Sequence, residues 1–143
     1  MTSGEKKDHK IWIISLFPDF FRAFLETGLS GRALKGERES GLSVHLVQLR
    51  DYSSNSYKGV DDAPYGGGPG MVMRPDTLQK ALIDGVVVPG GYGDNWKEKL
   101  HIVFPGPRGR VWNQKSCQEF SQRAWGENGH GKDLVFICGR YEG

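Results

Sequence analysis

The stretch most suited to chemistry is a run of a dozen residues, 60–71, in the middle of the chain. Four of the five residues from Gly66 to Gly70 are glycine and the fifth is proline, and the acids Asp61 and Asp62 come just before them. Glycine lets a partner approach the main chain closely, and proline restricts its neighbours, so we expect a shaped loop rather than a helix or an ordinary strand. A flexible linker is the alternative, although linkers are usually Gly/Ser-rich without prolines, aromatics and paired acids.

Two shorter glycine-bearing segments each follow a run of apolar residues. Residues 105–110 come directly after the apolar run 100–104. Residues 139–143 come directly after the apolar run 134–138. Both runs are typical of strands, and a helix at 113–125 between them predicts a parallel βαβ unit. Because ligands of open α/β sheets bind at the carboxyl ends of the strands, both glycine-bearing segments are candidates for a binding site.

The start of the chain supplies another strand and the helix that follows it. Residues 11–17 form a β-branched and aromatic run with little alternation, which is typical of a strand buried on both faces in a parallel sheet. Pro18 ends the run. Apolar residues then recur at helical spacing from Asp19, and Gly28 is the expected stop of that helix.

The remaining elements complete an α/β pattern. A strand is predicted at 42–49, in which His45 is a polar strand residue, and a short helical piece at 30–35 precedes it. A helix is predicted at 73–86, directly after the glycine loop. The second glycine-rich stretch, 89–95, has no paired acids and is expected to be an ordinary surface loop. The predicted fold class is therefore α/β, with a mostly parallel sheet and flanking helices.

Length and charge limit the possible classes. A chain of 143 residues is long enough for one domain with a core, which we place at residues 10–143 after a flexible tail at 1–9. The net charge of +2 is too small to indicate a nucleic-acid partner from the overall field, so such a partner would need local patches. No signal peptide or transmembrane span is recognisable, so a cytoplasmic protein without a membrane partner is expected.

Several familiar chemical motifs are missing. No G-x-G-x-x-G follows the first strand, and neither a P-loop nor a G-x-S-x-G nucleophile motif occurs. The cysteines, Cys117 and Cys138, have no CxxC partner or histidine at zinc-ligand spacing, so we expect reduced thiols and no metal site. Cys138 lies inside an apolar strand, where inert packing is favoured over catalysis.

Three motifs in order resemble a known family. Leu16-Phe17-Pro18 after the first strand, the glycine-rich motif at 61–71 and Gly-Arg-Tyr-Glu-Gly at 139–143 resemble the bacterial tRNA (guanine-N1)-methyltransferases of the SPOUT class. The resemblance covers residues 11–143 and rests mainly on the long glycine motif. It implies transfer of a methyl group from S-adenosyl-L-methionine to N1 of guanine-37, just 3′ of the anticodon in tRNA. It also implies a homodimer with its active site at the subunit interface, and a domain with a trefoil knot.

The same resemblance implies roles for individual residues. The cofactor-binding residues would be Phe104, Pro105, Gly106, Pro107, Gly109, Gly139, Tyr141, Glu142 and Gly143. The residues against the target base would be Asp62, Tyr65, Gly66, Gly67, Gly68, Pro69 and Gly70. Glu142 would reach toward cofactor or guanine in a supporting catalytic role, while a packed, half-buried ring is the alternative for Tyr141. Loops with few side chains suit this task, because the edge of an adenine can be read by backbone N–H and C=O groups.

The chain departs from the family pattern in two places. Where the family has a Leu-Ser-Pro-Gln-Gly type of sequence, residues 105–109 read Pro-Gly-Pro-Arg-Gly, which removes a serine and adds the charge of Arg108 beside the pocket. The sequence also stops at Gly143, before the family's second half of the knot and its catalytic aspartate and arginine. We therefore expect these residues alone to be the N-terminal part of the methyltransferase domain, inactive and at best a weak binder of cofactor.

Two other functions remain open. A non-catalytic RNA-binding module would use the glycine loop and Arg108, Arg110 and Arg140 against phosphates, although the near-neutral charge and the lack of an aromatic stacking platform argue against it. A generic nucleotide-binding α/β scaffold would bind adenine nucleotides regardless of the methyl-sulfonium group. Titrations with S-adenosyl-L-methionine, ATP and tRNA separate the three.

Overall fold

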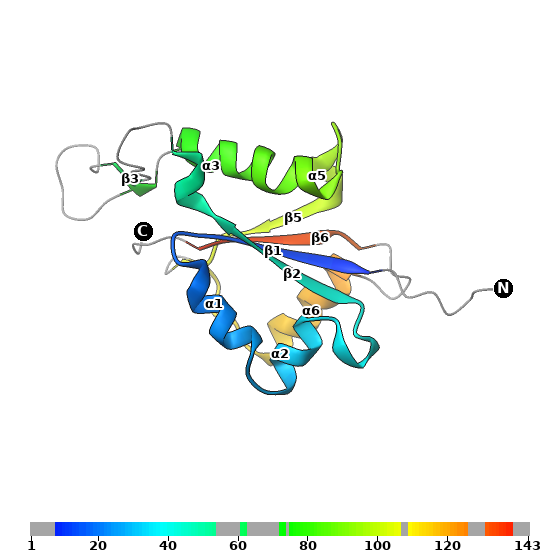
Figure 1. The fold of residues 1–143 in the computed structure, drawn as a ribbon. Helices are drawn as coiled ribbons and strands as arrows, with labels where there is room; N and C mark the ends of the chain where they lie inside the picture. Colours follow the sequence, from blue (N-terminus) through cyan, green and yellow to red (C-terminus); the bar gives the residue numbers. More distant parts are fainter. Residues whose placement is uncertain are drawn as a thin grey trace.

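The protein is built on a four-stranded parallel sheet (Figure 1). The computed structural model describes residues 8–53, 61–62, 72–73, 75–106, 109–125 and 131–138. The strands of the sheet are β1 (His9–Ser15), β2 (Leu42–Gln48), β5 (Leu100–Val103) and β6 (Asp133–Cys138). Their spatial order is β2-β1-β6-β5, and every neighbouring pair is parallel. The predicted α/β class with a mostly parallel sheet is confirmed.

Helices cover both faces of this sheet (Figure 1). On one face lie α1 (Pro18–Leu25), α2 (Gly28–Leu34) and α6 (Gln114–Trp125). On the other face lie α3 (Pro75–Leu82), its continuation η3 (Ile83–Val87) and α4 (Val88–Gly90), and the short α5 (Trp96–Lys99). Two 3₁₀ turns, η1 (Glu37–Glu39) and η2 (Leu49–Tyr52), flank β2, and a two-stranded antiparallel pair, β3 (Asp61–Asp62) with β4 (Val72–Met73), stands apart from the main sheet.

The two faces of the sheet are unequally buried. Alternating side chains of β1, Trp12 and Ile14, join Val86 and Val135 in a large buried cluster beneath the α3 layer. The strand residues that alternate with these, such as Ile11, point to the other face and belong to a smaller cluster on the α6 side. Strand β1 is therefore apolar on both faces, as its run of apolar residues predicted.

The smaller cluster leaves apolar side chains on the surface of its face. On α1, Phe20 is 77% exposed and Phe24 54% exposed, and Phe17 just before that helix is 54% exposed. These residues produce the helical spacing seen in the sequence, yet they point largely to solvent in this structure. Helical periodicity predicted the helix correctly but not how deeply its apolar side chains are buried.

Element boundaries differ from the predictions at a few places. Strand β1 begins at His9, so this residue belongs to the sheet although the sequence placed it in the tail. Gly28 does not merely stop α1: it is the first residue of α2, with φ of +69°, a conformation that glycine adopts without the strain of a side chain. Beyond Leu82 the helix that follows the glycine loop changes to π-type hydrogen bonding.

The prediction of an ordinary surface loop at 89–95 is wrong. Val88–Gly90 is helical, and the chain then turns at Gly91 so that Tyr92 packs inside the large cluster with 7% of its surface exposed. The Tyr92 hydroxyl accepts a hydrogen bond from Trp12 Nε1 at 2.8 Å. The glycine-rich composition correctly indicated turns, but the Tyr92 ring of this segment is buried in the core.

Candidate functional site

The carboxyl ends of the four parallel strands meet at one edge of the sheet, on the left of Figure 1. Val103, the last residue of β5, is opposite Phe136 of β6, and Cys138 at the end of β6 is opposite Ser15 at the end of β1. The segments that follow β5 and β6 therefore leave neighbouring strands at the same edge. This is the location at which open α/β sheets bind ligands.

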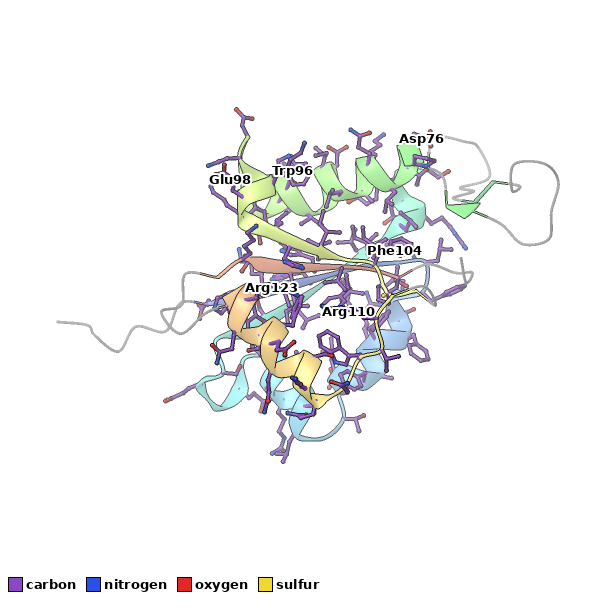
Figure 2. The ribbon with its side chains drawn as sticks, turned by 180° about the vertical axis from the view of Figure 1, so that it is seen from behind. Asp76, Trp96, Glu98, Phe104, Arg110 and Arg123 are labelled. Atoms are coloured by element: carbon purple, nitrogen blue, oxygen red, sulfur yellow. The ribbon has the colours of Figure 1, made fainter. Side chains whose placement is uncertain are left out.

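The segment after β5 lies on the surface. Phe104, Pro105 and Gly106 are all exposed, Phe104 by 52%. The backbone N–H of Gly109 donates to the carbonyl of Gly106 at 3.3 Å, which closes a turn. In Figure 2 the chain runs from Phe104 at the end of β5 past Arg110 to the start of α6. Of the residues predicted here, Pro107 and the neighbouring Arg108 lie outside the described residues.

Gly106 is not required by the packing of the chain itself. A Cβ built on this residue would meet no atom of the described residues within 4 Å, and its φ is not in the left-handed region. Glycine at such a position leaves room for something other than the described chain to approach the main chain. The exposed residues Phe104 to Gly106, with open space at Gly106, therefore suit a surface that contacts a ligand through backbone N–H and C=O groups.

The glycine loop predicted against the target base is closed at its two ends. Asp61 pairs with Met73, and Asp62 pairs with Val72, in the antiparallel β3–β4 ladder. The ladder holds the start and end of this segment side by side, which a flexible linker would not need. Of the predicted residues only the backbone of Asp62 is described, and Tyr65, Gly66, Gly67, Gly68, Pro69 and Gly70 lie outside the described residues.

The junction between β1 and α1 forms a compact turn at the same edge. Buried Ser15 accepts a hydrogen bond on Oγ from the backbone N–H of Phe17 at 3.0 Å. Leu16 is buried in the large cluster, Phe17 faces solvent, and Pro18 occupies the first turn of α1, where proline is tolerated. The Leu-Phe-Pro motif therefore combines a core anchor, an exposed ring and a helix start.

The candidate residues of the last segment, Gly139, Tyr141, Glu142 and Gly143, lie outside the described residues. Cys138, immediately before them, is half-buried at the end of β6. Burial raises the pKa of the Cys138 thiol, so the thiol is protonated at neutral pH. A protonated thiol is a poor nucleophile, which agrees with the prediction of inert packing.

His45 lies well away from this edge segment. Its ring stacks on Trp12 with 4.5 Å between centroids, and its Nε2 is 3.1 Å from Ser43 Oγ. Burial, followed by the nearby charge of Lys10, lowers the pKa of His45. These contacts support its interpretation as a polar strand residue.

Two hollows in the described surface lie apart from the residues 104–106. A groove of about 740 Å³ follows the outer edge of β2 and includes Trp12, Arg22 and His45 in its lining. A smaller one of about 460 Å³ lies at the turn between α1 and α2, beside Arg32 and Lys35. Neither is lined by Phe104, Pro105 or Gly106.

Sequence reasoning missed an aromatic cluster next to the candidate wall. The ring of Phe120 on α6 contacts those of His101 and Trp112 edge-on, with centroids 4.9 Å and 5.6 Å away. The guanidinium of Arg123 lies over the same ring, 5.7 Å from its centroid. The spacing of Phe120 and Arg123, three residues apart on a predicted helix, was the available signal.

No helix within the part of the chain that the structure describes is long and apolar enough to span a membrane. Within the same part, no three His, Cys, Asp or Glu residues are grouped so as to hold a metal ion.

Comparison with known proteins matches nearly the whole chain. A family model described as tRNA (Guanine-1)-methyltransferase TrmD covers residues 9–143. A tRNA (guanine-N(1)-)-methyltransferase of Sulfurihydrogenibium sp. (strain YO3AOP1) is 36% identical over 135 residues, which are 94% of this chain and 45% of the relative. Proteins of the same name from Saccharopolyspora erythraea and Nitratidesulfovibrio vulgaris are 39% and 42% identical, over 44% and 26% of their own lengths. The chain thus spans less than half the length of these relatives, and it belongs to the tRNA (guanine-1)-methyltransferase TrmD family.

Proposed function

We propose that this chain supplies the cofactor-side and base-side walls of an enzyme that methylates N1 of guanine-37, just 3′ of the anticodon, in tRNA. The observation that carries the proposal is the parallel pairing of β5 with β6, with Val103 opposite Phe136. It brings the starts of the two predicted cofactor segments, at 104 and 139, to neighbouring strands. The family match and the names of the relatives support the reaction.

The methyl donor in this proposal is S-adenosyl-L-methionine, which supplies an activated methyl group on its sulfonium. Phe104, Pro105, Gly106 and Gly109 would hold its adenine end from the β5 side. The exposure of Phe104, Pro105 and Gly106 and the open space at Gly106 fit this role. Pro107, Gly139, Tyr141, Glu142 and Gly143 complete the proposed set from positions that the structure does not describe.

The target guanine would lie against the loop that β3 and β4 enclose. In that loop Asp62, Tyr65, Gly66, Gly67, Gly68, Pro69 and Gly70 are the proposed contacts. Methylation at N1 removes the proton of that nitrogen and places negative charge on the base. A carboxylate base and a cationic group are the chemical requirements of this step, and Glu142 is proposed only in a supporting role.

The same proposal extends to the assembled enzyme. It comprises a SPOUT-type domain with a trefoil knot, a cytoplasmic homodimer and an active site at the subunit interface. The apolar side chains left exposed on α1, such as Phe20 and Phe24, support a further contact of this face. Sedimentation of the protein over a range of concentrations tests the dimer.

Calorimetric titration tests the proposed function directly. S-adenosyl-L-methionine, ATP and tRNA are titrated separately into the purified protein. The proposal expects S-adenosyl-L-methionine to bind more tightly than ATP and tRNA to bind as well. Equal affinity for the two adenine compounds would favour a generic nucleotide-binding scaffold, and tRNA binding without any binding of S-adenosyl-L-methionine would favour a non-catalytic RNA-binding module.

A further inference from the structure

The α6 platform, defined as His101, Trp112, Phe120 and Arg123, is an aromatic and cationic surface beside β5. Phe120 lies at its centre, with both other rings edge-on to it and the Arg123 guanidinium over its face. His101 comes from β5, Trp112 from the segment before α6, and the other two from α6 itself. Three separate parts of the chain therefore converge on one surface.

The outermost ring of the platform is largely uncovered. Trp112 is 61% exposed, and its neighbour Val111 is 83% exposed. A tryptophan in this position leaves apolar ring surface in contact with water. Burial of that surface by a ligand would be favourable. Phe120 is half-buried and packs against the smaller core cluster on one side, while Trp112 on its other side remains exposed.

The hydrogen bonds at the start of α6 tie down the backbone on both sides of Trp112. The side chain of Asn113, the next residue, accepts a hydrogen bond on Oδ1 from the backbone N–H of Ser116 at 2.8 Å. The carbonyl of Asn113 also accepts from the N–H of Cys117 at 2.9 Å, and Ser116 Oγ donates to the carbonyl of Val111 at 3.4 Å. The backbone on both sides of Trp112 is thus tied to the helix start, and the ring itself lies edge-on to Phe120 with 5.6 Å between centroids.

Positive charge accompanies the rings. Residues 109–125 contain the basic Arg110, Lys115 and Arg123 against a single acid, Glu119. Burial lowers the pKa of His101, and the charges of Arg123 and Lys132 lower it further, so both cations act on the platform. Arg123 and Lys132 are exposed, and neither takes part in an ion pair with another residue that the structure describes.

We propose that the α6 platform binds a single-stranded segment of RNA, with a base stacked on Trp112 and phosphates held by Arg123 and Lys132. An exposed tryptophan ring next to exposed cations matches the flat bases and charged backbone of such a strand. The identification of the ligand as RNA rests on the proposed function, in which tRNA is the substrate.

The platform is continuous with the proposed cofactor wall. The chain runs directly from Phe104 past Arg110 to α6 (Figure 2), and Trp112 is part of this run. In the same view Arg123 lies on α6 near the sheet. Lys132 directly precedes β6 and so lies at the amino end of that strand, and Arg123 lies in the last turn of α6. RNA held by Trp112 and these two cations would run along α6, so this surface would position the substrate rather than take part in the chemistry.

Fluorescence anisotropy with a labelled anticodon stem-loop RNA tests the platform. The variants are Trp112→Ala and Arg123→Gln, with Trp112→Phe as the conservative change that keeps a ring. The matched controls are Val88→Ala, which shortens an exposed apolar side chain of α4 on the other face of the sheet, and Lys97→Gln, which removes an exposed cation of α5. Each variant is checked for an unchanged melting temperature and for its oligomeric state by sedimentation.

We expect Trp112→Ala to weaken RNA binding by at least about fivefold, because base–aromatic stacking is lost. Trp112→Phe should recover most of the affinity. Arg123→Gln should reduce the slope of log affinity against log salt by about 1, as the loss of one phosphate contact requires. Both control variants should bind within about twofold of the unaltered protein.

Three results would overturn the platform as an RNA site. The first is the absence of RNA binding by the unaltered chain, and the second is an equal loss of RNA affinity in the platform and control variants. The third is a change in oligomeric state with RNA affinity intact, which would indicate a protein–protein contact. Calorimetry with S-adenosyl-L-methionine separates this inference from the proposed function. If the protein binds S-adenosyl-L-methionine and Trp112→Ala leaves RNA affinity unchanged, only the platform is rejected. If Trp112→Ala loses RNA binding and the protein binds no S-adenosyl-L-methionine, only the methyltransferase function is rejected.

Discussion

Tyr92 donates a hydrogen bond from its hydroxyl to Asp133 Oδ2, with 2.5 Å between the oxygens. The same hydroxyl accepts from Trp12 Nε1 at 2.8 Å, and Asp133 Oδ1 accepts from the backbone N–H of Lys10 at 3.0 Å. The network joins β1, β6 and the turn after α4, which lie far apart in sequence. It attaches the α3 layer to the sheet at the end opposite the candidate site.

Replacing Tyr92 with Phe should lower the free energy of unfolding by about 2 kcal/mol, because Trp12 Nε1 and Asp133 both lose a partner in a largely buried position. Urea denaturation measures the difference. Tyr52→Phe is the matched control, and it should cost under about 0.5 kcal/mol. Equal losses in the two variants would mean that the network contributes little to stability.

Stability should fall in alkaline solution because of the same tyrosine. Burial, and then the hydrogen bond to Asp133, raise the pKa of Tyr92 well above its ordinary value. The unfolded chain therefore releases this proton first, and the contribution to stability is complete below about pH 10 and is lost as the pH rises above it. Melting temperatures between pH 8 and pH 11 should show a decline that is shallower in Tyr92→Phe than in the unaltered protein.

The pKa of His45 predicts a change in the acid range. Burial and the charge of Lys10 lower that pKa, so the unfolded state takes up a proton at a higher pH than the folded state. This contribution to stability is present above about pH 6.5 and is lost as the pH falls through the lowered pKa. His45→Phe keeps a ring against Trp12 and should flatten the melting curve against pH between 5 and 7. An identical pH dependence in the variant would contradict this assignment.

Gly106 and Gly91 should separate ligand binding from stability. Gly106→Ala introduces a methyl group into open space, so the melting temperature should not change, while affinity for S-adenosyl-L-methionine should fall if a ligand approaches this backbone. Gly91 has a φ of +69°, so Gly91→Ala should destabilise the fold by about 1 kcal/mol and leave cofactor affinity unchanged. Unaltered binding in Gly106→Ala would remove this residue from the proposed pocket.

Gly85 gives a contrasting prediction about packing. A Cβ at this position would lie 2.8 Å from Val47 Cγ1 and 3.0 Å from the Tyr52 hydroxyl oxygen. Gly85→Ala should therefore destabilise the protein by about 1–3 kcal/mol through overpacking between the helical layer and β2. Denaturant titration measures it, and the double variant with Val47→Ala should recover part of the loss.

The two cysteines should differ in reactivity. Cys117 is exposed on α6, whereas Cys138 is half-buried with a raised thiol pKa. Iodoacetamide at neutral pH should label Cys117 many times faster, because the thiolate is the reacting species. Mass spectrometry after timed labelling measures both rates, with Cys117→Ser confirming the assignment. Faster labelling of Cys138 would contradict its role as packing.

The sequence alone determined the class of fold and the main strands. The apolar run at 11–17 predicted a strand buried on both faces, and the runs at 100–104 and 134–138 predicted β5 and β6 within one residue at each end. These predictions succeeded because short runs of β-branched and aromatic residues favour the buried strands of a parallel sheet. The ordered motifs also identified the family, which the matched residues confirm.

Only the tertiary structure decided which buried residues become neighbours. The order β2-β1-β6-β5 places residue 104 beside the end of β6, and it brings Tyr92 to Trp12 and His101 to Phe120. No local sequence pattern indicates these contacts, because each joins segments whose relative position depends on the packing of the whole sheet. Local patterns therefore predicted the helices and strands, whereas long-range packing produced the Tyr92 network, the exposed position of Gly106 and the α6 platform.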